Sequence, residues 1–311
     1  MIDQAVHPAN TQAAEAALRR DLVRGDAAAA SALPMLRYLV AADQSAALSE
    51  EILARVRGIL SDIAGQLLDA LIGTADRRAH APDEIAVLTR AFLDDAALLA
   101  HVHAVALEWQ LTERLQERLA LDPVASPFVR DRIASGDASA HGFLSAQARW
   151  SQGQRRMALS VAELPEAVLE AVLAILRALV GAEPALSERA SAVEREVRSS
   201  HAAVSNRLIW AERMVADLDP AVALSISQCG VTLFLSALAL ASGQVRDATV
   251  MATLPDQQAR LALTLLAAGA PADVTEEQIR MIHGGTKLPV GLAGIEEWRA
   301  ASILTNGATA Q

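Results

Sequence analysis

The chain has 311 residues, of which 52% are hydrophobic, 21% are charged and only 3% are aromatic. This composition is typical of a globular protein with a sizeable core and excludes an intrinsically disordered chain. The formal net charge is −10 and the sequence pI is about 5.2. Both values argue against a broad nucleic-acid-binding face and against electrostatic docking on an anionic membrane surface.

Helical hydrophobic periodicity extends through almost the whole chain, and no segment alternates as a β-strand would. Gly25 is expected to end the first helix, and Pro34 to kink or break the second. Ser49 is expected to cap the third helix, whose apolar residues recur every three or four positions from Ile52 to Leu71. In chain order we expect helices at residues 11–24, 26–42, 49–73, 83–92, 94–119, 127–135, 138–152, 165–181, 187–218, 220–243, 245–253, 256–268, 275–283 and 292–304.

The segment from Pro220 to Val245 contains no charged residue and is long enough to span a bilayer. It also contains several Ser, Thr and Gln residues, and its flanks show no clear asymmetry of positive charge. A helix that is buried on all sides explains this composition better than a membrane span does. We therefore expect the C-terminal region to pack on a single buried helix over 220–243.

Many short helices on short connections predict an all-α fold of stacked helical hairpins, either a HEAT-like α-solenoid or an irregular multi-helix array. A change of composition near residues 160–165 marks the best internal boundary, and Pro165 suits the first position of a helix. The expected regions are an N-terminal helical-repeat region over 1–163, a C-terminal helical region over 164–285, and a loop plus terminal helix over 286–311.

Single residues of two types restrict the chemistry that the chain can perform. Cys229 is the only cysteine, which excludes an internal disulfide and a CxxC metal site and indicates a small core residue. Lys287 is the only lysine, and its surroundings do not match a phosphate-binding P-loop, so we interpret it as part of a loop. The N-terminus lacks the basic and apolar regions of a secretory signal, and we expect a cytoplasmic protein.

Other candidate residues have structural explanations that need no chemistry. His101 and His103 lie two positions apart on a predicted helix, which places their side chains roughly 200° apart and prevents a shared metal ion. Asp94 and Asp95 could form a carboxylate pair, but an N-cap with an acidic first turn explains them without any chemistry. We expect no catalytic residue, no cofactor and no metal site.

A small basic cluster is the first candidate binding surface. Arg149, Arg155 and Arg156 lie close to Trp150 in the sequence. Guanidinium groups bind anions and carboxylates, so the cluster could hold an anion or the acidic patch of a partner protein. A solvated helix end is the simpler interpretation.

His201 is the second candidate, because it lies on a long, strongly charged predicted helix. An exposed histidine on such a helix is typical of a phosphorelay protein, which would also need a four-helix bundle and an acidic or amide partner. Glu194 and Asn206 are within reach in the sequence. Glu194 and Arg198 are also ordered correctly for an i,i+4 ion pair.

Several short segments also carry a family resemblance: 48–53, 92–99, 155–157 with 163–165, 234–239 and 267–271. Their residues and their order, over roughly residues 30–285, resemble an uncharacterised, mainly alphaproteobacterial family of HEAT-like helical repeats, domain of unknown function 2336. That family has no assigned catalytic residues. The resemblance therefore implies an architecture, stacked helices that present a surface, and no site residue.

The sequence thus predicts a non-enzymatic cytoplasmic scaffold or regulatory protein that binds another protein, and neither nucleic acid nor a membrane. One alternative is a phosphorelay or sensory signalling protein that uses His201. A second alternative is a small-molecule binder or enzyme whose site is assembled from residues scattered along the chain. The absence of motifs favours the scaffold by association only, because a fold does not assign a function.

Overall fold

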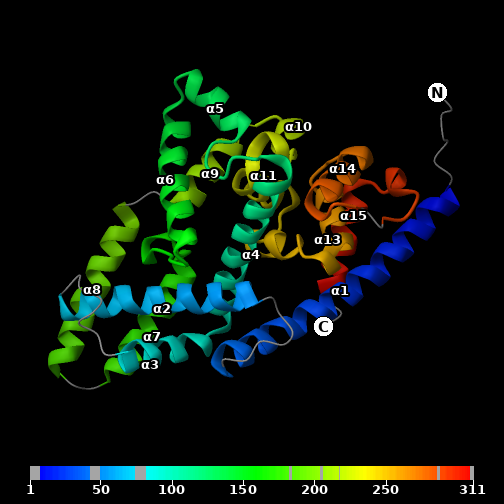
Figure 1. Cartoon of the computed structure of the whole chain (residues 1–311). Helices are drawn as coiled ribbons and strands as arrows, with labels where there is room; N and C mark the ends of the chain where they lie inside the picture. The colour runs from blue at the N-terminus through cyan, green and yellow to red at the C-terminus, as the bar shows by residue number, and fades with distance from the viewer. Residues whose placement is uncertain are drawn as a thin grey trace. The chain divides into compact units, whose positions relative to one another are not determined.

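The computed structural model describes residues 8–42, 50–73, 82–181, 184–203, 206–216, 218–285 and 288–308. Within these residues the chain forms fifteen α-helices, short 3₁₀ turns and no β-strand (Figure 1). The predicted all-α fold is confirmed. The predicted N-cap Ser49 and the predicted loop residue Lys287 lie outside the described residues.

The chain divides into two compact units, each assembled from separate segments. Unit 1 comprises residues 1–31, 110–144 and 211–311, and unit 2 comprises residues 32–109 and 145–210. The predicted boundaries at 163 and 285 do not coincide with this division.

Helix α1 runs without interruption over Pro8–Ala42, so the two helices predicted here are wrong. Gly25 serves close packing in unit 1 and does not end the helix. A Cβ at this position would lie 2.8 Å from the backbone oxygen of Asp256, which belongs to the 3₁₀ turn η3 (Pro255–Gln257). Pro34 lies within α1, where its ring removes one backbone hydrogen bond from a helix that has many on either side.

Unit 2 contains helices whose inward faces carry the predicted apolar stripes. Those that lie wholly or partly in it after α1 are α2 (Glu50–Ile72), α3 (Pro82–Leu93), α4 (Ala96–Leu119), α6 (Ala138–Arg155), α7 (Glu166–Val180), α8 (Pro184–Ala203) and α9 (Arg207–Val215). Val56, Ile59 and Ile63 of α2 are fully buried, as the spacing of apolar residues predicted. Trp109 of α4 is among the largest fully buried side chains.

The single helix predicted over 187–218 is wrong, because α8 ends at Ala203 and α9 begins at Arg207. The side-chain oxygen of Asn206 accepts a hydrogen bond from the amide of Ile209 at 3.0 Å. Asn206 therefore caps α9, and asparagine is among the residues most favoured at such a position. Pro165 was predicted as the first residue of the next helix. It is instead the N-cap residue of α7, which begins one position later at Glu166.

The two acidic residues before α4 have separate structural contacts. Asp95 accepts a hydrogen bond from the amide of Leu98 at 2.8 Å and so caps the helix. Asp94 forms an exposed ion pair with Arg37. The interpretation of these carboxylates as structural residues agrees with both contacts.

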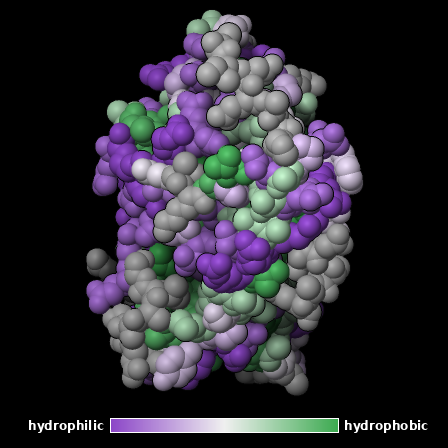
Figure 2. Space-filling view, turned by 90° about the vertical axis from the view of Figure 1, so that its right-hand side faces the viewer, coloured by the Kyte–Doolittle hydropathy of each residue, from purple (hydrophilic) through white to green (hydrophobic). Residues whose placement is uncertain are grey.

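Unit 1 combines the first part of α1 with a middle segment and with the C-terminal helices. The helices that lie wholly in it are α5 (Pro127–Ala134), α10 (Pro220–Ala223), α11 (Ile226–Ser242), α12 (Arg246–Met251), α13 (Gln258–Ala267), α14 (Ala272–His283) and α15 (Glu297–Ala308). On the face shown in Figure 2, hydrophilic side chains predominate, and hydrophobic side chains form small patches between them.

The charge-free segment lies largely in the core of unit 1, but the single helix predicted over 220–243 is wrong. It forms α10 and α11, and Gly230 within α11 has a φ of 75° and a ψ of 170°. Essentially only glycine adopts this conformation. A Cβ at Gly230 would also lie 3.0 Å from the Cβ of Ser126. None of the described helices is both long enough and apolar enough to cross a membrane.

Candidate functional site

The basic cluster at the end of α6 (Ala138–Arg155) and just beyond it is divided between the surface and the core. Arg149, Arg155 and Arg156 are exposed, whereas Trp150 is only 4% exposed. The Trp150 ring packs edge-on against Trp109 of α4, with the ring centroids 5.6 Å apart and the planes at 72°. Trp150 is therefore a core residue, and the arginines alone form the exposed part of the cluster.

A buried ion pair adjoins Trp150. The Arg207 guanidinium lies 3.8 Å from the centroid of the Trp150 ring and donates two hydrogen bonds, of 2.7 and 2.8 Å, to the Glu108 carboxylate. The Arg207 and Glu108 side chains are 3% and 0% exposed. Such a two-pronged contact satisfies both charges in the interior. This ion pair was not predicted from the sequence, although a glutamate within the apolar pattern of α4 is a signal of it.

The end of α6 turns back sharply along the helix. The amide of Ala158 donates to the Gly153 carbonyl at 2.9 Å, and the amide of Met157 donates to the Gln154 carbonyl at 3.0 Å. This is the Schellman pattern, with Met157 in the left-handed position at a φ of 54°. Gly153 permits the return, since a Cβ there would lie 2.9 Å from the Ala158 oxygen.

Two polar side chains of α2 hold the returning segment in place. Asp62 accepts a hydrogen bond from the Leu159 amide at 3.1 Å. Gln66 accepts from the Val161 amide at 3.0 Å and donates to the Leu159 carbonyl at 2.8 Å. Buried backbone groups need such partners, so the polar residues of α2 fix this backbone. The apolar spacing of α2 predicts its buried face but not these contacts, which were not predicted.

Between α6 and the returning segment lies a pocket of about 200 Å³, which we call the α6 pocket. Its lining residues come from both segments and include charged, aromatic and aliphatic side chains: Arg149, Trp150, Gly153, Ala158, Leu159, Ser160, Ala162 and Glu163. Of the four residues in the predicted cluster, the pocket brings together only Arg149 and Trp150.

Glu163 forms the acidic wall of the α6 pocket. It ends the 3₁₀ turn η2 (Val161–Glu163), and its carboxylate accepts a hydrogen bond from the Arg207 amide at 3.2 Å. Burial raises the pKa of Glu163, while the nearby charges of Arg207, Arg149 and His201 act in the opposite direction. The pocket thus presents a carboxylate close to several cationic groups.

His201 is half-buried near the end of α8, and its Nε2 atom is hydrogen-bonded to the Leu164 carbonyl at 2.9 Å. Asn206, one of its two proposed partners, caps α9. Glu194, the other, lies in an ion-pair network. These contacts give all three residues structural roles, and the phosphorelay interpretation stays a prediction.

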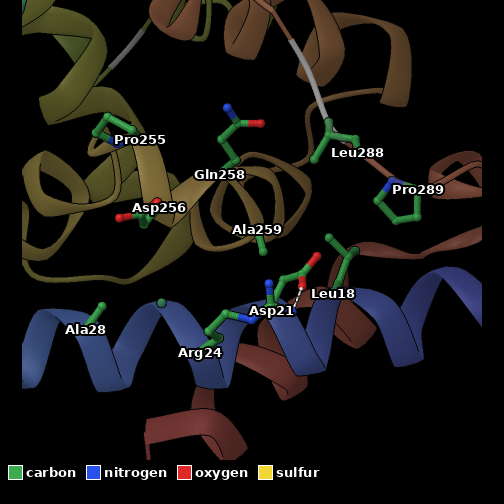
Figure 3. A pocket seen from close by; sticks show the side chains of 11 residues that line it. Leu18, Asp21, Arg24, Ala28, Pro255, Asp256, Gln258, Ala259, Leu288 and Pro289 are labelled. Carbon is green, nitrogen blue, oxygen red and sulfur yellow. Dashed lines mark hydrogen bonds and ion pairs between the residues drawn. The ribbon is translucent and has the colours of Figure 1, made fainter.

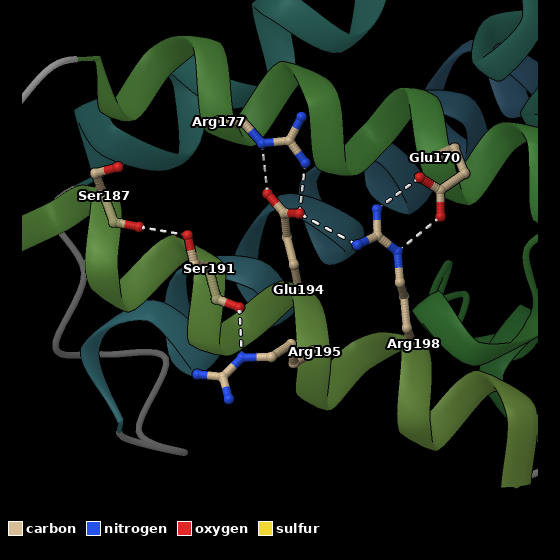
Figure 4. A network of polar contacts seen from close by, with 7 residues as sticks. All are labelled: Glu170, Arg177, Ser187, Ser191, Glu194, Arg195 and Arg198. Carbon is tan, nitrogen blue, oxygen red and sulfur yellow. Dashed lines mark hydrogen bonds and ion pairs between the residues drawn. The ribbon is translucent and has the colours of Figure 1, made fainter.

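The network around Glu194 joins α7 to α8 (Figure 4). Arg177 donates to Glu194 through Nε at 2.8 Å, and Arg198 donates to it at 3.3 Å, so the predicted i,i+4 pair is confirmed. Arg198 also donates two hydrogen bonds to Glu170, of 2.8 and 2.6 Å, which lower the pKa of that carboxyl. The arrangement links two neighbouring helices.

A second opening in unit 2 is an apolar groove of about 480 Å³ bordered by α2, α3, α7 and α8. Its residues are mostly large and aliphatic: Leu68, Leu71, Ile72, Asp83, Glu84, Val87, Leu88, Leu176, Leu179, Val180 and Leu186. Ile72, Val87 and Leu179 are 50%, 52% and 46% exposed. Asp83 and Glu84, also exposed, make the rim at α3 acidic.

Unit 1 has a polar pocket of about 400 Å³ where α1 faces the segment around η3 (Figure 3). Asp21 and Arg24 line it and form an ion pair of 2.9 Å with each other. Close to the pocket, the Gln257 side chain of η3 donates a hydrogen bond of 2.5 Å to the Gly25 carbonyl of α1. The charged groups that Figure 3 shows on α1 thus satisfy each other.

The remaining residues singled out in the sequence are buried in the structure. His101 and His103 are both buried, and burial lowers the pKa of His103 to about 4. Cys229 is buried in α11, where burial raises the pKa of its thiol to about 12. The described residues include no group of three or more His, Cys, Asp or Glu side chains that could hold a metal ion.

No family model, no curated protein and no solved structure matches this chain. The resemblance to HEAT-like repeats therefore stays a prediction, and function must be argued from the sites themselves.

Proposed function

We propose that the protein is a non-enzymatic helical scaffold whose apolar groove binds an amphipathic helix of another protein. The observation that carries the proposal is the exposure of Ile72, Val87 and Leu179 around one apolar groove. Contiguous exposed apolar surface is a feature of protein interaction sites. A groove between helices suits a partner helix that presents apolar side chains three and four positions apart.

The connections that adjoin the groove do not supply such side chains. Residues 74–81 join α2 to α3, and residues 182–183 join α7 to α8. Neither segment contains Leu, Ile, Val, Met or Phe. This composition favours an occupant from another protein.

The acidic rim at Asp83 and Glu84 defines the second property of the partner. Opposite charges across an interface increase the association rate and fix the orientation of the partner. The proposed partner helix therefore carries arginine or lysine residues beside its apolar face. A cytoplasmic location and a HEAT-like repeat architecture belong to the same proposal, on the basis of the sequence features described above.

Site-specific photo-crosslinking in extracts of the source cells tests the proposal. A photoreactive residue at Val87 is expected to capture a partner whose crosslinked peptide is an amphipathic helix with basic flanks. The Val87→Glu change is expected to abolish capture by a photoreactive residue at Leu179. Val245→Glu provides the matched control, because Val245 is an exposed valine outside the groove.

Capture of a peptide without an apolar helical face would overturn the proposal. Equal capture by the Val87→Glu and Val245→Glu proteins would also overturn it, since the groove would then have no part in binding.

A further inference from the structure

We infer that the α6 pocket is a binding site for a small zwitterion of the aliphatic α-amino-acid class. This site shares no lining residue with the apolar groove. The inference goes beyond the proposed scaffold function and does not depend on it.

Two oppositely charged side chains, Arg149 and Glu163, line the α6 pocket. Arg149 and Glu163 interact electrostatically, but no direct ion pair joins them in the described part of the chain. A ligand that carries both an ammonium and a carboxylate could pair with both of these charges. Its carboxylate would accept from the Arg149 guanidinium, and its ammonium would donate to Glu163.

Trp150 contributes the aromatic part of the lining. This side chain lines the pocket and is more than nine-tenths buried. Its indole nitrogen is itself buried, so the carboxylate of the ligand would be held by Arg149.

The walls of the pocket are preorganised for such a ligand. The Trp150 ring is fixed by its contacts with the Trp109 ring and with the Arg207 guanidinium. Hydrogen bonds from Asp62 and Gln66 fix the returning backbone. Rigid walls reduce the entropy that a bound ligand must offset.

Size and lining define the rest of the ligand. A pocket of about 200 Å³ is smaller than the roughly 300–1,000 Å³ of sites for drug-sized molecules, so it suits a single small metabolite. Leu159, Ala158 and Ala162 contribute aliphatic wall beside the charged groups. An aliphatic side chain on the amino acid would lie against them.

Isothermal titration calorimetry with L-alanine, L-valine and L-leucine tests the inference on the full chain. At least one of them is expected to bind at millimolar concentration or below. Analogues that keep only one charged group are expected to bind roughly tenfold more weakly or worse, because one charged wall is then left unpaired. For leucine these analogues are isocaproate, which lacks the amine, and isoamylamine, which lacks the carboxylate.

Two conservative variants assign the binding to the pocket. Arg149→Gln and Glu163→Gln are each expected to weaken amino-acid binding at least roughly tenfold while the circular dichroism spectrum stays unchanged. Arg155→Gln is the matched control, since Arg155 is exposed on the same helix and does not line the pocket. It is expected to bind like the unmodified chain.

The inference would be overturned if none of the three amino acids binds. Equal binding of isocaproate and leucine would also overturn it, because that result describes a simple anion site. Equal loss in Arg155→Gln and Arg149→Gln would place the binding outside the pocket.

Discussion

Because His103 is buried, we expect the protein to lose stability as the pH becomes mildly acidic. The residue is 2% exposed, its Nδ1 atom has no hydrogen-bond partner among the described residues, and burial lowers its pKa from 6.5 to about 4. The unfolded chain therefore binds more protons than the folded chain between these two values. The free energy of unfolding should fall as pH decreases from about 6.5 to about 4.

Urea denaturation at several pH values measures this dependence. The His103→Gln protein is expected to lose less stability than the unmodified chain across the same pH range. His141→Gln is the control, because His141 is an exposed histidine of α6, whereas His103 is buried in α4. A steep loss of stability that persists fully in His103→Gln would contradict the assignment.

The α6 pocket could be predicted from the sequence only in part. Arg149 and Trp150 were singled out because a basic cluster beside an aromatic residue is visible locally. Asp62 contacts Leu159 at a separation of 97 positions, and Gln66 contacts Val161 at 95 positions. Periodicity on one helix carries no information about such distant partners, so the residues that shape the pocket were missed.

The contact between α4 and α9 depends on the buried pair of Glu108 and Arg207. Glu108→Gln would leave the Arg207 guanidinium buried without a full counter-charge. Breaking a buried pair in this way costs about 3–5 kcal/mol, which should appear as a lower free energy of unfolding in urea. Asp94→Asn is the control, because the exposed pair of Asp94 and Arg37 should contribute no more than about 1 kcal/mol.

If the Glu108→Gln and Asp94→Asn proteins have the same free energy of unfolding within error, the buried pair contributes little to stability. Replacement of both Glu108 and Arg207 by apolar residues separates the desolvation cost of the two charges from their mutual attraction. Since the desolvation cost then disappears together with the attraction, the double variant should be more stable than Glu108→Gln alone.

Helix α11 depends on the conformation of Gly230. Gly230→Ala should lower the free energy of unfolding by about 3 kcal/mol, because backbone strain and the contact with Ser126 both oppose a Cβ. Gly136→Ala is the matched control, since Gly136 also has a positive φ but nothing lies within 4 Å of its Cβ position. Strain alone should cost about 1 kcal/mol there. Equal losses in both variants would show that the contact with Ser126 has no effect.

Most helices were predicted from periodicity, and the errors have identifiable causes. Gly25 was predicted to end a helix, yet it lies within α1 and permits close packing against η3. Asn206 and Gly230 interrupt segments that were predicted as continuous, through a side-chain cap and a glycine-specific backbone conformation. Hydrophobic spacing predicts which face of a helix is buried. The interruptions at Asn206 and Gly230 depend instead on single residues and their distant neighbours.

The formal charge of −10 acts on every partner of the whole molecule. An acidic field should attract a helix with basic flanks and repel one with acidic flanks before either reaches the groove. Asp83 and Glu84 add a local contribution at the rim. The apolar contacts inside the groove are insensitive to charge, so the two contributions can be separated by ionic strength.

Two synthetic amphipathic peptides with the same leucine stripe, one flanked by arginines and one by glutamates, test this separation by fluorescence anisotropy. The arginine-flanked peptide should bind roughly tenfold more tightly at ~0.1 M salt, and the ratio should approach one at ~1 M salt, where the screening length falls from ~10 to ~3 Å. Asp83→Asn combined with Glu84→Gln should reduce the ratio without abolishing binding, whereas Val87→Glu should weaken both peptides. A ratio near one at low salt would contradict the acidic rim as a determinant of partner choice and leave apolar shape as its basis.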